Sequence, residues 1–280
     1  MFAAVMSASA AAALIAGHRG WTDVGIVALA GLAATIGGYS HPLAVATGRF
    51  IVILVISLST MENGGPRAAI FALLLSGALW TSLVAFGLGS LLRPAGWSSD
   101  RASEPDRTAS SARKYRRWIA SLKTLAGWQF ALRLVPSLAA AGVLRAAWPD
   151  HHLLWIAVTV AILCQRSLEP IPTRTMQRSV GAAVGVAATA LLLGRLLPGW
   201  GLALLAGALA AFGSWLRAQN YLMYTASMTL LIILLLSAGA LIEVGTLIDR
   251  LLATLIGAAL VLAANMAVAK ISNHRVGYAS

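Results

Sequence analysis

Arg174 and Arg178 are the residues whose type and spacing point most directly to chemistry. They stand four positions apart, so on a helix their side chains share one face. Pro170 and Pro172 interrupt the chain just before these arginines, and Thr173 or Thr175 could cap a helix that starts there. Two guanidinium groups near a helix N-terminus would attract a carboxylate, which arginine can bind through two parallel hydrogen bonds. Alternatively, both arginines simply mark the cytoplasmic side of a membrane segment.

Four further charged residues fall inside apolar segments or at the start of one: Arg49, Arg133, Asp249 and Arg250. A charge in the middle of a membrane span costs about 2.5–3.5 kcal/mol on insertion scales. We therefore expect Arg49 and Arg133 to face protein or water, which makes both candidates for a polar transport path. Asp249 could carry a coupling proton and Arg250 could shape the path, or the pair could have a local structural role.

Asn220, Tyr221 and Tyr224 could line a route with hydrogen-bonding groups, or they could anchor the chain at the membrane interface. The pair His151-His152 predicts no metal site, because adjacent side chains do not share a helix face and no acidic or thiol cluster accompanies them. The sequence has no phosphate loop, no Gly-x-Ser-x-Gly and no His-Glu-x2-His. We therefore expect no enzyme activity and no cofactor, and a pump would need an ion gradient or a partner.

The composition excludes most classes of soluble protein. Hydrophobic residues make up 59% of the 280 positions and charged residues 11%, against roughly 45–50% and about 25% in ordinary globular chains. Mean hydropathy is +0.81. The net charge of +12 could indicate nucleic acid, but the basic residues lie in short gaps between long apolar runs. The expected partner is therefore the lipid bilayer rather than nucleic acid, and the single cysteine, Cys164, cannot form an internal disulfide.

The fold class expected is all-α, a polytopic transmembrane helical protein, because the apolar runs are continuous and a spanning helix needs about 20 residues. Ten candidate spans are Met1–Gly17, Asp23–Gly38, Pro42–Thr60, Pro66–Leu92, Thr124–Ala147, His152–Gln165, Ser179–Leu197, Gly199–Leu216, Tyr221–Ala240 and Leu247–Ala269. The first, second and sixth are short. Gly181 and Gly185 form a small-x3-small pair, which predicts close approach of another helix.

The distribution of basic residues sets the predicted orientation. With the N-terminus cytoplasmic, the segments Arg93–Lys123 and Arg166–Arg178 and the basic tail all fall inside, which is a clear positive-inside bias. We therefore expect an inner (plasma) membrane protein with both termini cytoplasmic. Within the first segment, Arg113–Trp118 could lie on the anionic leaflet as a short interfacial helix, or serve only as a topology signal. Tryptophans near span ends are expected to anchor the interface: Trp97, Trp118, Trp128, Trp148, Trp155 and Trp200.

A weak internal repeat relates two unequal halves. Gly20-Trp21 aligns with Gly199-Trp200 without gaps, and Pro42–Thr60 then falls on Tyr221–Gly239, although two apolar sequences can also match by chance. The first half lacks a counterpart of Lys123–Arg178, as if it were truncated, and a homo-oligomer could complete a pathway. The predicted parts are 1–92 (N-terminal membrane half, four spans), 93–123 (basic cytoplasmic linker), 124–270 (C-terminal membrane half, six spans) and 271–280 (cytoplasmic tail).

The stretch from Trp155 to Lys270 resembles the fusaric-acid-resistance (FUSC) type of bacterial inner-membrane transporter domain. The residues that carry the resemblance are Trp155–Val160, Thr173–Gly185, Asn220-Tyr221 and Asp249–Gly257. They resemble a Trp-rich span, an Arg-x3-Arg-x2-Gly-x3-Gly turn into a helix, and a late helix with arginine ahead of glycine. Ala182 departs from the pattern, because the family usually carries threonine after the first glycine of that turn.

The resemblance implies transport of an organic anion across a membrane, since members are similar to aromatic carboxylic acid efflux pumps, fusaric-acid resistance proteins and plant malate channels. The expectation is an inner-membrane exporter of small organic, including aromatic, carboxylic acids, driven by an ion gradient. Arg174 and Arg178 would collect the anion at the cytoplasmic mouth. A passive anion channel and a non-transporting structural or assembly protein are the alternatives.

Overall fold

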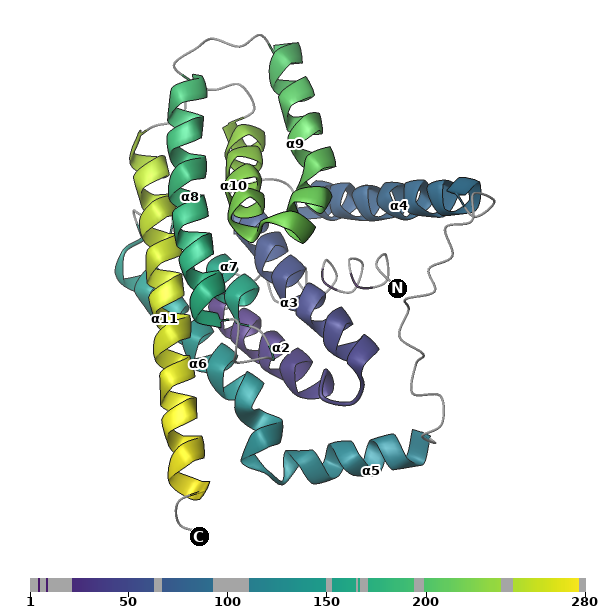
Figure 1. Ribbon diagram of the computed structural model, residues 1–280, viewed down its shortest axis with the longest axis vertical. Coiled ribbons are helices and arrows are strands. Elements are labelled where there is room, and N and C mark those ends of the chain that lie inside the picture. Colours follow the sequence, from purple (N-terminus) through teal and green to yellow (C-terminus); the bar gives the residue numbers. More distant parts are fainter. Residues whose placement is uncertain are drawn as a thin grey trace. The chain divides into compact units, whose positions relative to one another are not determined.

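The computed structural model describes Val5, Ser9 and residues 22–62, 67–92, 111–149, 153–164, 166, 171–193, 199–237 and 244–276. Within these residues the regular secondary structure is entirely helical, which agrees with the predicted all-α class (Figure 1). The helices are α2 (Thr22–Ile36), α3 (His41–Glu62), α4 (Arg67–Leu92), α5 (Ser111–Leu122), α6 (Leu125–Ala147), α7 (Leu154–Leu163), α8 (Ile171–Leu193), α9 (Gly199–Gln219), α10 (Tyr221–Ser237) and α11 (Val244–Val276).

Three of the described helices are long and apolar enough to cross a membrane. The qualifying stretches are His41–Leu58 in α3, Gly127–Ala147 in α6 and Leu247–Ile271 in α11. Helices α2, α7, α9 and α10 and part of α4 contain shorter apolar stretches. The predicted span Met1–Gly17 lies outside the described residues, apart from Val5 and Ser9. A helical membrane protein is supported, while the count of ten spans and the repeat stay predictions.

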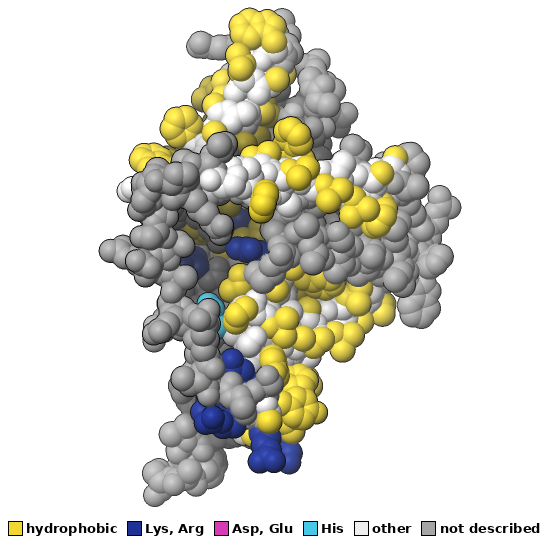
Figure 2. All heavy atoms as spheres, turned by 90° about the vertical axis from the view of Figure 1, so that its right-hand side faces the viewer, with side chains coloured by type: hydrophobic (Ala, Val, Ile, Leu, Met, Phe, Trp, Pro, Cys, Tyr) yellow, Lys and Arg dark blue, Asp and Glu magenta, His cyan; other side chains and the backbone are white. Residues whose placement is uncertain are grey.

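Large apolar side chains cover much of the exposed surface, as a lipid-facing protein requires. Trp80 and Phe86 on α4 and Leu191 on α8 are each at least two-thirds exposed, and so is Trp200 at the start of α9. Figure 2 shows hydrophobic side chains spread over the described part of one face. Soluble monomers rarely expose apolar surface on this scale. These side chains are therefore consistent with contact to the hydrocarbon core of a bilayer.

The chain divides into two compact units. The first unit comprises the described residues of Met1–Ala139 and Lys270–Ser280, and the second unit comprises those of Ala140–Ala269. The boundaries between the two units fall within α6 and near the end of α11. Neither boundary coincides with an end of the predicted linker 93–123. That linker contains helix α5. The predicted membrane halves 1–92 and 124–270 remain a sequence-based prediction.

The core of the first unit is built where α2, α3 and α6 meet. Helix α2 packs beside α3, and its Gly31 allows close approach of α6, since a Cβ at this position would lie 3.2 Å from Val135 Cγ2. Leu54 on α3 and Leu134 and Leu138 on α6 are almost completely buried. Helices that are apolar on all sides can bury one face in this way and still present an apolar face outward.

The second unit is held together by glycines that let helix backbones touch. A Cβ on Gly185 of α8 would lie 2.6 Å from the Ala226 carbonyl oxygen of α10, and a Cβ on Gly181 would collide with the Thr225 hydroxyl. The predicted packing role of Gly181 and Gly185 is confirmed. Gly185, the later glycine on α8, contacts a later residue of α10 than Gly181 does. Helices α8 and α10 therefore run in the same direction (Figure 1). Gly257 of α11 packs in the same way against α7.

Candidate functional site

Arg174 and Arg178 are the fourth and eighth residues of α8, near its N-terminus as the sequence predicts. Helix α8 begins at Ile171, so the two arginines share one helical face. The prediction that Thr173 or Thr175 caps the helix is wrong, because both residues lie inside it. Proline is tolerated in the first turn, where its missing N–H would have no partner within the helix, and α8 therefore includes Pro172 instead of starting after it.

Arg178 faces the beginning of α10. Its guanidinium is within hydrogen-bonding reach of the Tyr221 hydroxyl, and Tyr224 is close enough to interact electrostatically. Its Nε atom is buried and has no hydrogen-bond partner among the described residues. A buried donor left without an acceptor costs about 1–3 kcal/mol, so such atoms are rare in folded proteins and often mark functional positions. The Nε donor of Arg178 can therefore serve an incoming acceptor.

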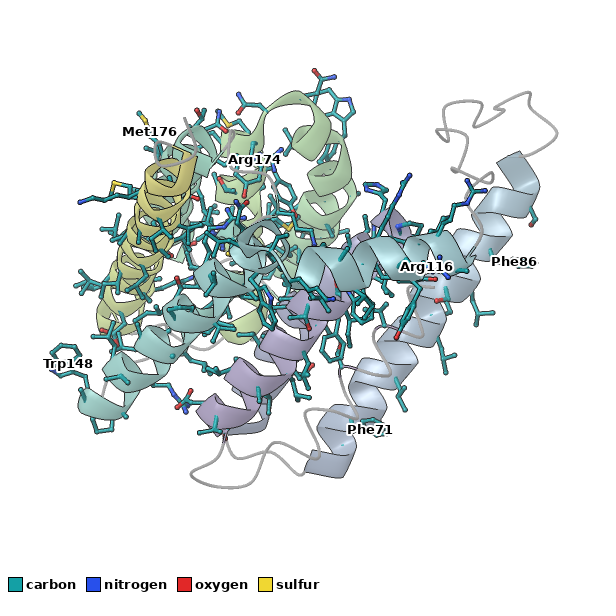
Figure 3. All side chains as sticks on the ribbon, turned by 90° about the horizontal axis from the view of Figure 1, so that it is seen from below. Phe71, Phe86, Arg116, Trp148, Arg174 and Met176 are labelled. Carbon is teal, nitrogen blue, oxygen red and sulfur yellow. The ribbon has the colours of Figure 1, made fainter. Side chains whose placement is uncertain are left out.

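Two tyrosine rings at the start of α10 lie beside the arginines of α8. The Arg174 guanidinium carbon lies 5.9 Å from the centre of the Tyr221 ring, and the Tyr221 and Tyr224 rings are 6.0 Å apart at a tilt of 36°. Met176 points away from Arg174 and is largely exposed (Figure 3). The face of α8 that carries both arginines is thus the face that meets α10.

Arg250 adds a buried guanidinium from α11. Its side chain is 7% exposed, and its guanidinium carbon lies 3.8 Å from the centre of the Trp155 ring at the start of α7. Arg250 and Arg178 are close enough to interact electrostatically. Like charges in a low-dielectric setting repel each other, so an anion bound between them would be favoured. Asp249, the neighbouring residue, is also buried.

Asn220 has a clear local role at the start of α10. Its Oδ1 accepts hydrogen bonds from the backbone N–H groups of Leu222 at 3.0 Å and Met223 at 3.4 Å. These are the contacts of an N-cap residue, which satisfies amide groups that the first turn of a helix leaves without partners. The bonds hold the N-terminal turn that presents Tyr221 and Tyr224 to Arg178. A contact between Asn220 and a transported ligand stays a prediction.

Arg49 and Arg133 belong to the first unit and differ in environment. Arg49 is exposed on α3. Arg133 is 1% exposed on α6, and its Nε donates a hydrogen bond to the Gln129 carbonyl oxygen at 3.1 Å. Within the second unit, interactions join Arg178 to Tyr221, Tyr224 and Arg250. Arg49 and Arg133 belong to the first unit. Their predicted place in a transport path stays a prediction.

Trp155 is the site residue that the sequence analysis missed, because it was interpreted as an interface anchor. Trp155 opens the stretch that resembles the FUSC domain, and this position could have marked it as a site residue. Its contact with Arg250 could not be predicted, because the two residues are far apart in the chain. The described residues contain no group of three or more His, Cys, Asp or Glu side chains that could hold a metal ion. His151 and His152 lie outside the described residues.

Comparison with known proteins finds a similarity to one family in the C-terminal part of the chain. Residues 138–264 match the family described as fusaric acid resistance protein-like, which confirms the resemblance inferred from the sequence. The match covers a little under half of the chain and lies within the segment that carries the sequence resemblance. The matched range contains the whole arginine and aromatic cluster of the second unit. No curated protein and no solved structure matches the chain.

Proposed function

We propose that the protein exports small organic carboxylic acids, aromatic ones included, across the inner membrane with an ion gradient as the driving force. The observation that carries the proposal is the cluster of Arg178 and Arg250 within the matched segment: Arg178 is half-buried with a buried Nε atom, and Arg250, on a different helix, is buried. The predicted orientation, with both termini cytoplasmic, would place Arg174 on the cytoplasmic side of this cluster, where it could collect the anion.

The unused Nε donor of Arg178 suits a carboxylate. A guanidinium binds a carboxylate most strongly through two parallel N–H···O bonds, and the edge that contains Nε can form such a pair. Arg250 would add a second positive charge in a low-dielectric setting. The arrangement therefore favours an anion over a neutral solute of the same size.

The rings beside the arginines support the aromatic part of the proposal. Tyr221 and Tyr224 lie against α8, and Trp155 stacks on Arg250. Aromatic rings prefer offset or edge-to-face contacts with one another, and each such pair contributes about 0.5–1.5 kcal/mol beyond its buried area. A benzoate-like acid could place its carboxylate on Arg178 and its ring among these side chains. Asp249, buried next to Arg250 in the chain, is the proposed carrier of a coupling proton.

Transport by the purified full chain in proteoliposomes tests the proposal. We expect uptake of labelled benzoate to depend on an imposed pH gradient and to fall about 10- to 100-fold in Arg178→Gln, which corresponds to roughly 1.5–3 kcal/mol for one hydrogen bond to a charged group. Arg178→Lys keeps the positive charge but loses the two parallel N–H donors of the guanidinium, so its uptake rate should lie between those of the wild type and Arg178→Gln. Lys270→Gln removes an exposed cation at the end of α11 and serves as the matched control.

Several outcomes would contradict the proposal. Wild-type uptake in Arg178→Gln would remove the anion site from this cluster, provided that both proteins insert equally. Unitary currents in a planar bilayer would show a passive anion channel instead of a carrier. Failure to move any acid in a panel of aromatic and aliphatic compounds would favour a structural or assembly role.

A further inference from the structure

Helix α5 has one basic face and one apolar face. Arg113, Arg116 and Arg117 stand three and four positions apart, so they share a face, and all three side chains are exposed. The opposite face carries the apolar residues Tyr115, Trp118, Ile119 and Leu122. The helix contains no acidic residue that could neutralise the basic face internally. This pattern is typical of helices that lie in a membrane interface.

The apolar face of α5 is fixed to the first unit by Trp118. Its indole N–H donates a hydrogen bond to the Thr35 carbonyl oxygen near the end of α2 at 3.1 Å, and its ring meets the Tyr39 ring edge-on at 6.2 Å. The backbone of Gly38 lies against the same indole. Because Trp118 is docked, the face with the three arginines is turned away from the core of the first unit.

The joint between α5 and α6 is also fixed. The Trp128 indole N–H donates to the Leu122 carbonyl oxygen at 2.7 Å, and the Thr124 hydroxyl donates to the Ser121 carbonyl oxygen at 2.8 Å. A Cβ on Gly127 would collide with Ser121. Helix α5 therefore turns sharply away from α6, and Figure 1 shows it running across the lower end of that helix.

The joint places α5 at the end of a membrane span. The stretch of α6 that is long and apolar enough to cross a membrane starts at Gly127, a few residues after α5 ends. A helix that turns aside at the start of a span lies at the level of the lipid headgroups. Figure 2 shows Lys and Arg side chains gathered at the lower end of the visible face, the level at which Figure 1 places α5. The basic face thus meets the layer that contains the phosphates of anionic lipids.

We propose that α5 is a fixed interfacial helix whose Arg113, Arg116 and Arg117 bind the phosphate groups of anionic lipids. A topology signal requires positive charge on one side of the membrane but no fixed orientation. Here the indole bonds of Trp118 and Trp128 and the tight turn at Gly127 hold the helix in one orientation. The proposal is independent of anion transport by the second unit.

Site-specific quenching in nanodiscs tests the proposal with the full chain. Ala120, exposed on the basic face, is changed to cysteine in a Cys164→Ala background and carries an environment-sensitive fluorophore. We expect acrylamide to quench the label less in discs that contain phosphatidylglycerol than in discs of phosphatidylcholine alone. Each arginine near an anionic surface corresponds to roughly a fivefold change in binding, so the triple variant R113Q/R116Q/R117Q should need about 100-fold more phosphatidylglycerol for equal protection.

The triple lysine variant R113K/R116K/R117K is the matched control and should keep most of the protection, because it keeps the charge. The thermal midpoint of each variant in detergent verifies folding, and the exposed positions should leave it unchanged. Equal quenching in the two kinds of disc would overturn the proposal. Protection by soluble glycerol phosphate in discs of phosphatidylcholine would also overturn it, since the face would then bind a soluble anion.

Discussion

Arg133 in the first unit and Arg178 in the second show two ways in which an apolar helix can carry an arginine. Arg133 is 1% exposed, and its Nε donates to the carbonyl oxygen of Gln129, one turn earlier on α6. The Nε of Arg178 is equally hidden from solvent, but no described residue accepts its hydrogen. Burial of an arginine therefore does not identify a binding site. A binding site is better indicated by a buried hydrogen-bond donor, such as Nε of Arg178, that has no acceptor among the described residues.

The largest effect on stability is expected from Arg133→Gln. Loss of a buried charged group that is hydrogen-bonded within its own unit should lower the free energy of unfolding by about 3 kcal/mol. Denaturant unfolding in detergent measures this change, and Arg49→Gln is the control because Arg49 is an exposed arginine of the same unit. Equal free energies of unfolding in Arg133→Gln and Arg49→Gln would contradict a stabilising role of the buried Arg133.

Gly181→Ala should have the next largest effect, because it separates α8 from α10 one turn after Arg178. The new methyl group would collide with Thr225, and overpacking of this kind costs about 2 kcal/mol. Gly207→Ala on α9 is the control, since a Cβ at that position would meet nothing within 4 Å. Thermal unfolding of the two variants side by side measures the difference. If Gly181→Ala were as stable as its control, the close helix contact would be refuted.

Asn220→Ala should have the smallest effect, a loss of about 1 kcal/mol typical of an N-cap residue. The variant sharpens the comparison, because it loosens the turn that holds Tyr221 and Tyr224 against Arg178 without changing either arginine. Gln219→Ala, one residue earlier and exposed, is the control. Hydrogen exchange at the start of α10 should increase in Asn220→Ala alone. Unchanged exchange would show that the cap contributes nothing there.

The regular features of the fold could be predicted from local sequence. Continuous apolar runs predicted helices, the spacing of Arg174 and Arg178 predicted their common face, and the spacing of Gly181 and Gly185 predicted close packing. The start of α8 was placed too late because the proline at its second position was interpreted as a break rather than as part of the first turn.

Long-range contacts could not be predicted in the same way. The stacking of Trp155 on Arg250 depends on how α7 and α11 approach each other, which helical spacing within either segment does not specify. The difference between Arg133 and Arg178 likewise depends on which acceptors surround each side chain in three dimensions. Within a helix, i to i+4 spacing indicates that two residues share a face. It does not show whether the Nε of an arginine has a hydrogen-bond acceptor.

Ligand-induced stabilisation of the purified protein tests the central claim most directly. A carboxylate that binds only the folded state should stabilise it by about 2.7 kcal/mol at one hundred times its Kd. We predict that benzoate at this concentration raises the thermal midpoint of the wild type. It should raise that of Arg133→Gln by a similar amount from a lower starting value. It should stabilise Arg178→Gln by only about 0.4–1.4 kcal/mol, as a 10- to 100-fold weaker Kd requires. An equal rise in Arg178→Gln would show that the anion binds elsewhere and would contradict the account.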